Sequence, residues 1–207
     1  MLRIWGRDNS NNVKKVLWCA EEIGLPYEHI GTMSNPFTAA GGTPQRPAAP
    51  RGLEPTIDDD GLVVWQSHSI VRYLAARYSD GVLHEPDPAR RVLADRWMDW
   101  TISTFSQPFR DLTANALRAA DGERDSAAVE SALARCATLL PLAEAELAER
   151  PFLSGERLGI GDFPLGTLIH EWFQIPTERP DFPAIATWYG RLLTRPAYRK
   201  VVAVPLS

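Results

Sequence analysis

The sequence predicts an α/β domain followed by an all-helical domain, and three observations carry this prediction. Over residues 1–79, short apolar runs typical of β-strands alternate with helical patterns. From residue 89 onward, apolar residues recur at helical spacing. Between them, residues 80–88 contain an Asp-Gly pair and two prolines, which interrupt the periodicity. We therefore expect domains at 1–79 and 89–207, joined by a linker at 80–88.

The first part of the chain predicts a β-α-β unit. Residues 2–5 alternate in polarity and form a short strand, followed by a polar loop from Gly6 to Ser10. One helical face then collects Val13, Val16, Leu17, Ala20 and Ile23. Gly24 ends this helix, and residues 27–30 form a second strand, so the crossover should be right-handed.

Residues 54–78 predict a hairpin followed by a helix. Residues 56–58 and 62–65 are strands, and Asp-Gly in the turn between them favours a tight hairpin. Glu54 is held extended by Pro55, and the bond between them is a candidate for the cis isomer. Ser67 is suited to cap a helix whose apolar face includes Leu74. Its open N–H groups favour an anion, so this segment predicts a pocket for a small acidic peptide.

These segments resemble the soluble glutathione transferases over essentially the whole chain. The resemblance implies a thioredoxin-like α/β N-terminal domain and an all-α helical-bundle C-terminal domain. It implies that the backbone of Glu54, before a cis Pro55, pairs with the cysteinyl part of glutathione. Gln66 and Ser67 would receive the γ-glutamyl carboxylate. The family usually has an apolar residue at position 54. Because the backbone of this residue does the family's work, we expect the Glu54 side chain to face outward.

The run NSNNVKKVLW resembles the family segment in which a serine donates a hydrogen bond to the glutathione sulfur. This implies that Ser10 is catalytic and that Asn12 supports it. Lowering a thiol pKa from about 8.5 by two units needs about 2.7 kcal/mol. A hydroxyl donor to an anion contributes about 1.5–3 kcal/mol, and a helix N-terminus adds up to about 1. The alternative interpretation of Ser10 is a simple helix cap.

The resemblance also implies that the loop before the hairpin binds the glycyl carboxylate of glutathione. Residues 31–52 are rich in glycine and proline and predict a loop with a short helix. Gln45, Arg46 and Arg51 are candidates, and Arg51 is preferred because it directly precedes the approach to Pro55.

The C-terminal part predicts helices with interruptions at defined places. Asp87 and Pro88 fit a helix cap and first turn, Pro141 should kink or divide a later helix, and Asp162 should cap the helix that follows it. The aromatic residues suggest a pocket for a hydrophobic substrate, although core packing is the alternative for each. The pocket candidates are Trp5, Trp100, Phe105, Phe109 and Trp172.

Composition excludes several other classes of protein. A net charge of −4 without a basic stripe argues against nucleic acid as a partner. The absence of a membrane-length apolar run and of a secretory pattern argues against a membrane partner and predicts a cytoplasmic protein. Cys19 and Cys136 have no metal-ligand spacing, so no metal is expected. His68 is expected at solvent or at an interface.

We therefore expect a glutathione transferase that joins glutathione, as co-substrate, to a hydrophobic small-molecule electrophile. The alternatives are a glutathione-dependent disulfide reductase or isomerase on the same site, and an interaction or regulatory protein with weak catalysis. The resemblance also implies a homodimer. Charged residues on the expected contact helices would pair reciprocally in it, namely Arg72, Arg90, Arg91, Arg96 and Asp99.

Overall fold

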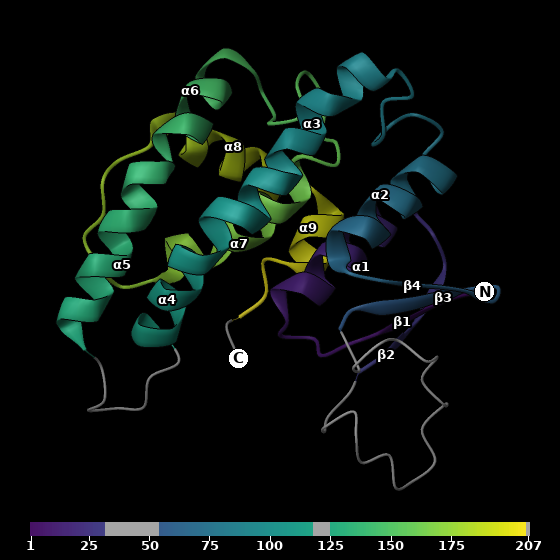
Figure 1. Ribbon diagram of the computed structural model, residues 1–207, viewed down its shortest axis with the longest axis horizontal. Helices are drawn as coiled ribbons and strands as arrows, with labels where there is room; N and C mark the ends of the chain where they lie inside the picture. Colours follow the sequence, from purple (N-terminus) through teal and green to yellow (C-terminus); the bar gives the residue numbers. More distant parts are fainter. Residues whose placement is uncertain (32–53, 118–124, 206–207) are drawn as a thin grey trace, which may run out of the picture. The chain divides into compact units, whose positions relative to one another are not determined.

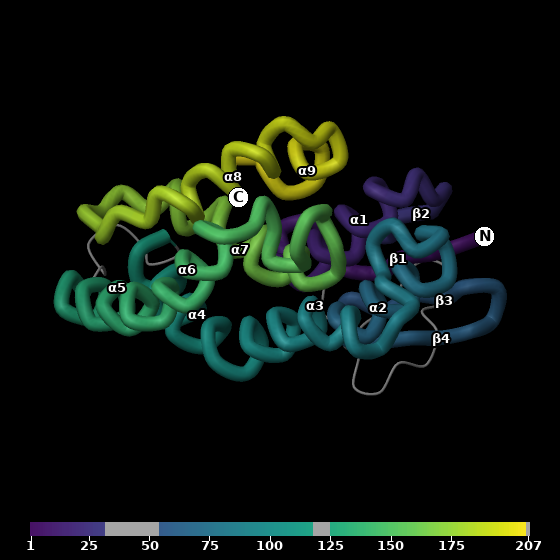
Figure 2. The backbone as a smooth tube through the Cα atoms, turned by 90° about the horizontal axis from the view of Figure 1, so that it is seen from above, coloured from purple at the N-terminus to yellow at the C-terminus, as the bar shows by residue number. Residues whose placement is uncertain are grey.

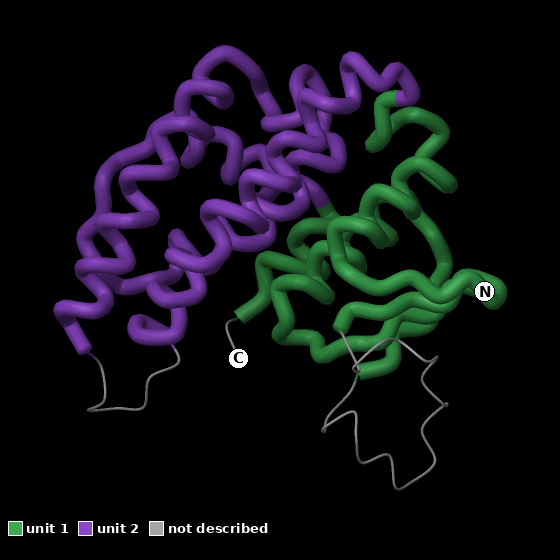
Figure 3. Tube along the Cα trace, in the orientation of Figure 1, with its two compact units in different colours: residues 1–85, 196–207 green, residues 86–195 purple. Residues whose placement is uncertain are grey.

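The computed structural model describes residues 1–31, 54–117 and 125–205. Two compact units emerge from the contacts within the chain (Figure 3). The first comprises residues 1–85 together with 196–207, and the second comprises residues 86–195. The domain limits drawn on the sequence remain a prediction. By packing, the C-terminal segment from Pro196 belongs with the first unit.

The first unit contains a four-stranded mixed sheet in the order β2-β1-β3-β4 (Figure 1). Its strands are β1 (Leu2–Trp5), β2 (Tyr27–Ile30), β3 (Thr56–Asp59) and β4 (Leu62–Trp65). β1 runs parallel to β2 and antiparallel to β3, and β3 and β4 form the predicted hairpin. Asp60 and Gly61 in its turn have φ of 49° and 95°, as a tight hairpin requires.

Helices α1 (Asn11–Ile23) and α2 (Ser67–Tyr78) lie side by side on one face of this sheet (Figure 1). The predicted apolar face of α1 is buried from Val13 to Ala20 and half-buried at Ile23, and Gly24 ends the helix in the left-handed conformation. Gly6 lets the chain leave β1 close to α1, because a Cβ at this position would meet a Val13 methyl at 2.3 Å. This close approach fixes where the polar loop begins.

The short helix α9 (Pro196–Val201) packs on α1 (Figure 2). Tyr198 is fully buried and meets the Trp18 ring edge to face, with centroids 4.8 Å apart. Glu21 of α1 accepts hydrogen bonds from Lys200 Nζ and from the Tyr27 hydroxyl, each at 2.6 Å. α9 therefore completes the core of the first unit from the far end of the chain.

The second unit is helical, as predicted. Its elements are α3 (Pro88–Trp100), η2 (Thr101–Phe105), α4 (Ser106–Ala116), α5 (Ser126–Leu139), α6 (Pro141–Glu149), α7 (Asp162–Gln174) and α8 (Pro183–Thr194). Asp87 caps α3 by accepting from Ala89 N–H at 3.0 Å. Pro141 begins α6 directly after α5 has ended, so the proline divides the predicted helix in two. No helix among the described residues is long and apolar enough to span a membrane.

Asp162 organises the start of α7 from a fully buried position. Its carboxylate accepts from the N–H groups of Leu153 at 2.8 Å, Ser154 at 3.2 Å and Gly159 at 3.1 Å. It also accepts from the Trp188 indole at 3.0 Å. The predicted cap is therefore confirmed and extends to α8. Burial raises the pKa of Asp162 to about 6, although the Ser154 side chain and the three backbone N–H donors act in the opposite direction.

Candidate functional site

Ser10 lies where the polar loop meets α1. It occupies the N-cap position with extended backbone, at φ −80° and ψ 120°, and its carbonyl accepts from Lys14 N–H at 2.9 Å. Its half-buried side chain makes no capping hydrogen bond. A capping role for the hydroxyl is therefore not observed, although the residue occupies the cap position. The hydroxyl stands beside the positive end of the α1 dipole.

The loop that carries Ser10 is anchored on the β2 side by a histidine. Gly6 N–H donates to Ile30 O at 3.2 Å, and His29 Nε2 donates to Gly6 O at 2.9 Å. The other ring nitrogen of His29 lies 3.5 Å from an Asp8 carboxylate oxygen. These contacts hold both the start and the middle of the loop against the sheet.

Glu54 anchors the same loop from the opposite side. Its carboxylate accepts from Arg7 N–H at 3.3 Å and lies 3.4 Å from Arg7 Nε. Only 14% of the Glu54 side chain is exposed, so the expectation that it faces outward is wrong. The reason is that the Ser10 loop passes close enough to supply both a backbone donor and a cation. The predicted cis bond between Glu54 and Pro55 is present.

The start of α2 differs by one position from the prediction. Gln66, not Ser67, occupies the N-cap position, with φ of 73° and no side-chain capping bond. Ser67 is the first helical residue, is buried, and donates through its hydroxyl to Asn12 Oδ1 at 3.4 Å. The Ser67 hydroxyl therefore bonds to a residue of α1 and does not cap its own helix. Gln66 is exposed at the tip of the turn.

A polar cluster joins α1 and α2 beneath these two serines. Lys15 is 3% exposed, and its ammonium donates to Asn12 Oδ1 at 3.0 Å. His68 is 6% exposed, and its Nε2 lies 3.4 Å from Lys15 Nζ. Burial, assisted by the charges of Lys15 and Arg72, lowers the pKa of His68 to about 3. The expected solvent position of His68 is therefore wrong, because the side chain turns in toward α1.

Sequence reasoning missed Lys15, His29 and the side-chain role of Glu54. The sequence did contain a signal for Lys15. This residue lies one helical turn before Cys19, which is fully buried, and residues four apart share one face of a helix. The predicted glycyl-binding candidates Gln45, Arg46 and Arg51 lie outside the described residues.

An aromatic row that includes the pocket candidates Trp100, Phe105 and Phe109 runs along α3, η2 and α4. Ring centroids are 5.5 Å apart between Trp97 and Trp100, 5.6 Å between Trp100 and Phe105, and 5.5 Å between Phe105 and Phe109. The π-helical segment η2 explains the middle contact, since its i→i+5 bonding brings residues five apart onto one side. An uninterrupted α-helix would separate Trp100 from Phe105.

Most of the predicted pocket residues are buried within their own unit. Trp5 of the first unit, and Phe105, Phe109 and Trp172 of the second, are each at most 2% exposed. Trp100 is the one of the five that is only half-buried. The Trp5 indole N–H has no hydrogen-bond partner among the residues described.

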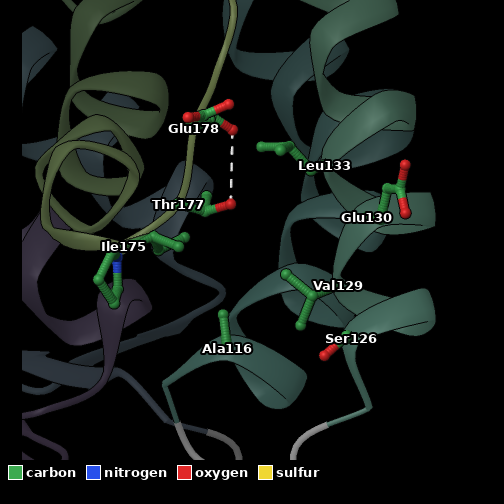
Figure 4. Close-up of a pocket in the computed structure, with 9 residues that line it drawn as sticks. Ala116, Ser126, Val129, Glu130, Leu133, Ile175, Thr177 and Glu178 are labelled. Atoms are coloured by element: carbon green, nitrogen blue, oxygen red, sulfur yellow. Dashed lines mark hydrogen bonds between the residues drawn. The ribbon is translucent and has the colours of Figure 1, made fainter.

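A separate cavity of about 530 Å³ lies within the second unit, between α4, α5 and the segment after α7 (Figure 4). None of the five predicted pocket residues lines it. Its lining is mostly apolar, includes two glutamates, and comprises Ala116, Ser126, Val129, Glu130, Leu133, Ile175, Pro176, Thr177 and Glu178.

The two cysteines are unsuited to nucleophilic chemistry. Both are buried as free thiols. Burial raises the pKa of Cys19 above its usual range and that of Cys136 to about 12. At neutral pH both therefore remain protonated, so neither cysteine supplies a thiolate.

Comparison with known families defines the class of protein. Residues 9–77 match the family described as "Glutathione S-transferase, N-terminal domain", and residues 93–196 match "Glutathione S-transferase, C-terminal domain". The two matches cover most of the chain. The chain therefore belongs to the glutathione S-transferase family of enzymes, which confirms the resemblance and the fold class drawn from the sequence.

Individual relatives agree with this over their full length. The chain is 40% identical over 209 residues to glutathione S-transferase GstB of Escherichia coli K12, covering 100% of both chains. It is 47% identical to the theta class glutathione S-transferase of Xanthomonas axonopodis pv. citri solved with glutathione bound. That likeness covers 100% of this chain and 99% of the other, with a TM-score of 0.91. The apo form of the same enzyme gives 45% identity and a TM-score of 0.87.

Proposed function

We propose that this enzyme binds glutathione on the first unit and transfers its thiolate to an electrophilic carbon of a hydrophobic small molecule. The observation that carries the proposal is the state of Ser10, whose hydroxyl stands at the N-terminus of α1 without a capping role. The relative solved with glutathione bound, at 47% identity, supports glutathione as the co-substrate.

In the proposed complex, three segments of the first unit hold the peptide. The backbone of Glu54, before the cis Pro55, pairs with the cysteinyl residue. Gln66 and Ser67, at the start of α2, receive the γ-glutamyl carboxylate, which the helix N-terminus favours. Arg51 is proposed for the glycyl carboxylate. No metal is needed for this chemistry.

The reaction proposed is a nucleophilic displacement or addition. The thiol loses its proton, the Ser10 hydroxyl donates to the resulting thiolate, and the sulfur electron pair forms a new C–S bond. A leaving group departs with the displaced electron pair, or in an addition the substrate takes up a proton. Asn12 supports Ser10 at the start of α1.

For the electrophile we propose an apolar contact with Trp100, the half-buried member of the aromatic row. Phe105 and Phe109 stack behind it in the same unit and fix its ring plane. Trp5 and Trp172 are each at most 2% exposed, so in this proposal they remain core residues of their own units. Aromatic surfaces accept many apolar groups, so the proposal names a class of substrate.

A homodimer in the cytoplasm completes the proposal. Conjugation consumes reduced glutathione, which the reducing poise of the cytosol maintains.

The dimer is supported by exposed apolar side chains on β4, an edge strand of the sheet: Leu62, Val63 and Trp65 are 49%, 37% and 39% exposed. The charged residues expected to pair across it have partners within the chain, with Arg91 near Asp95 and Arg96 near Glu146.

Calorimetry with glutathione tests the assignment of the peptide site. The wild type should bind in the micromolar to millimolar range. In the proposed complex the Ser67 hydroxyl turns from Asn12 Oδ1, 3.4 Å away, to the γ-glutamyl carboxylate, so Ser67→Ala should weaken binding by about tenfold to a hundredfold through loss of that charge-assisted hydrogen bond. Ser69→Ala, an exposed serine on the same helix, is the matched control and should bind like the wild type. Wild-type protein that fails to bind glutathione would refute the proposed function.

A further inference from the structure

The contact with Lys15 defines the orientation of the Asn12 carboxamide. Lys15 Nζ lies 3.0 Å from Asn12 Oδ1, and an ammonium has only donors, so the atom facing it must be the carboxamide oxygen. The Ser67 hydroxyl approaches the same oxygen at 3.4 Å. Both contacts lie on the inner side, toward α2.

The rest of Asn12 is open. Asn12 is an exposed residue, although Lys15 directly beneath it is 3% exposed. With the oxygen turned inward, the two N–H donors of the carboxamide are left for the open side, two residues after Ser10. A peptide bound along Ser10 and Ser67 would meet these donors.

The surroundings of Lys15 favour this arrangement. His68 from α2 faces the ammonium through Nε2 at 3.4 Å, and since the ammonium can only donate, the ring accepts there and carries its proton on Nδ1. His68 therefore stays neutral, with Arg72 of the same helix as a further positive charge near it. The positive charge of this cluster resides on Lys15 rather than on the imidazole.

We propose that Lys15 is a positioning residue: its ammonium holds the Asn12 oxygen inward, so that the Asn12 N–H donors are presented to the thiolate of glutathione beside Ser10. The inference rests on the proposed function and adds a residue to it. Lys15 acts through Asn12 and does not itself contact glutathione.

The test is a double-mutant cycle read by ultraviolet titration of the thiolate of bound glutathione. Lys15→Met keeps the length of the side chain but removes its donors. It should raise the bound thiol pKa and lower kcat at neutral pH by about tenfold, the lower end of the range for a donor to an anion, with glutathione Kd changed less than threefold. Asn12→Ala should have the same effect. The double variant should show no further change, because Lys15 acts through Asn12.

Two further variants complete the design. Asn12→Asp keeps an oxygen facing Lys15 and Ser67 but replaces the outward nitrogen with oxygen, so it should raise the thiol pKa more than Asn12→Ala does. It also tests the proposal if Lys15→Met does not fold. Lys14→Met is the matched control, since Lys14 is the neighbouring buried lysine at 5% exposure, and it should leave the thiol pKa unchanged.

The outcomes separate this inference from the proposed function. A wild type that binds glutathione with a lowered thiol pKa, together with a Lys15→Met variant of unchanged thiol pKa, would overturn the role of Lys15 alone. An Asn12→Asp variant of unchanged thiol pKa would overturn the role of the Asn12 donors and, with it, that of Lys15. Additive effects in the cycle would also overturn it, because Lys15 would then act by its charge directly. A wild type that does not bind glutathione defeats the proposed function itself.

Discussion

At the scale of single residues, the candidate site depends on which polar groups are already engaged. The Ser10 side chain makes no capping hydrogen bond, whereas the Ser67 hydroxyl is directed to Asn12 across the gap between two helices. A serine that does not cap its helix leaves its donor available for a ligand. This difference gives the two serines separate roles in the proposed site.

Ser10→Ala should leave glutathione affinity within a few-fold but raise the pKa of the bound thiol by about one unit or more. The hydroxyl discriminates between thiol and thiolate, and a donor to an anion is worth about 1.5–3 kcal/mol. Activity at neutral pH should fall about tenfold to a hundredfold and recover in part as the pH rises. Ultraviolet titration gives the pKa directly.

Ser10→Thr provides the control for this prediction, because it retains a hydroxyl at the same position. It should restore the lowered thiol pKa. If Ser10→Ala titrates like the wild type and turns over at the same rate, then another donor activates the sulfur.

At the scale of elements, local chemistry accounts for most of the helix and strand boundaries. Gly24, Asp87 and Pro141 each set a boundary where the sequence places them. Such signals act over a few residues, so they are readable from the chain. The contact between Glu54 and Arg7 joins residues 47 positions apart, and that between Lys15 and His68 spans 53. No local pattern encodes these pairs, so the side-chain environment of the site could not be predicted.

The single-residue error at α2 has the same origin. Ser67 has the composition of a cap, but the positive φ of Gln66 begins the helix one residue earlier and turns the serine toward Asn12. Similarly, the helical spacing of apolar residues from residue 89 does not reveal the π-helical turn at 101–105, which rotates everything after it.

Asp162→Ala should destabilise the enzyme by more than about 3 kcal/mol. The substitution leaves four donors from three segments without an acceptor; three of them are buried, and each such buried group costs about 1–3 kcal/mol. Urea denaturation measures the loss. Asp111→Ala, which removes an exposed pair with Arg135, should change stability by less than about 1 kcal/mol. Equal effects of the two variants would contradict the organising role of Asp162.

Glu21→Gln should destabilise the enzyme at neutral pH but not in acid. Burial opposes ionisation of Glu21, yet hydrogen bonds from Lys200 and Tyr27 outweigh it and lower the pKa of the carboxyl below its usual 4.5. A carboxyl with a lowered folded pKa contributes stability that is full above its unfolded pKa and lost as pH falls through the folded one. The difference between wild type and variant should therefore shrink below about pH 4.5.

Thermal unfolding of both proteins across a pH series measures this difference. Glu28→Gln is the control, because that carboxylate is 43% exposed and pairs with an exposed Arg3. A Glu21→Gln difference that persists unchanged in acid would show that packing, rather than charge, ties α9 to α1.

At the scale of the whole molecule, the exposed apolar side chains of β4, Leu62, Val63 and Trp65, are a surface for a second subunit. Edge strands with apolar side chains pair with other chains unless they are protected, and a two-fold partner supplies such protection. Light scattering should give the mass of a dimer at micromolar concentration, and Trp65→Glu should shift it toward the monomer. Leu142→Glu, which changes an exposed leucine on α6, should remain dimeric. A wild-type monomer would remove this part of the proposal.

The packing of α9 against α1 has a consequence for the order in which the enzyme is made. Residues 196–201 leave the ribosome only after the whole helical unit has been synthesised, yet they bring the buried Tyr198 to the ring of Trp18. During synthesis, the part of α1 around Trp18 therefore stays uncovered until the second unit has been made and α9 follows it. The core of the unit that carries Ser10 and Ser67 is completed only then. A nascent chain halted before Pro196 should expose that surface to chaperones, whereas the same chain extended past Val201 should not.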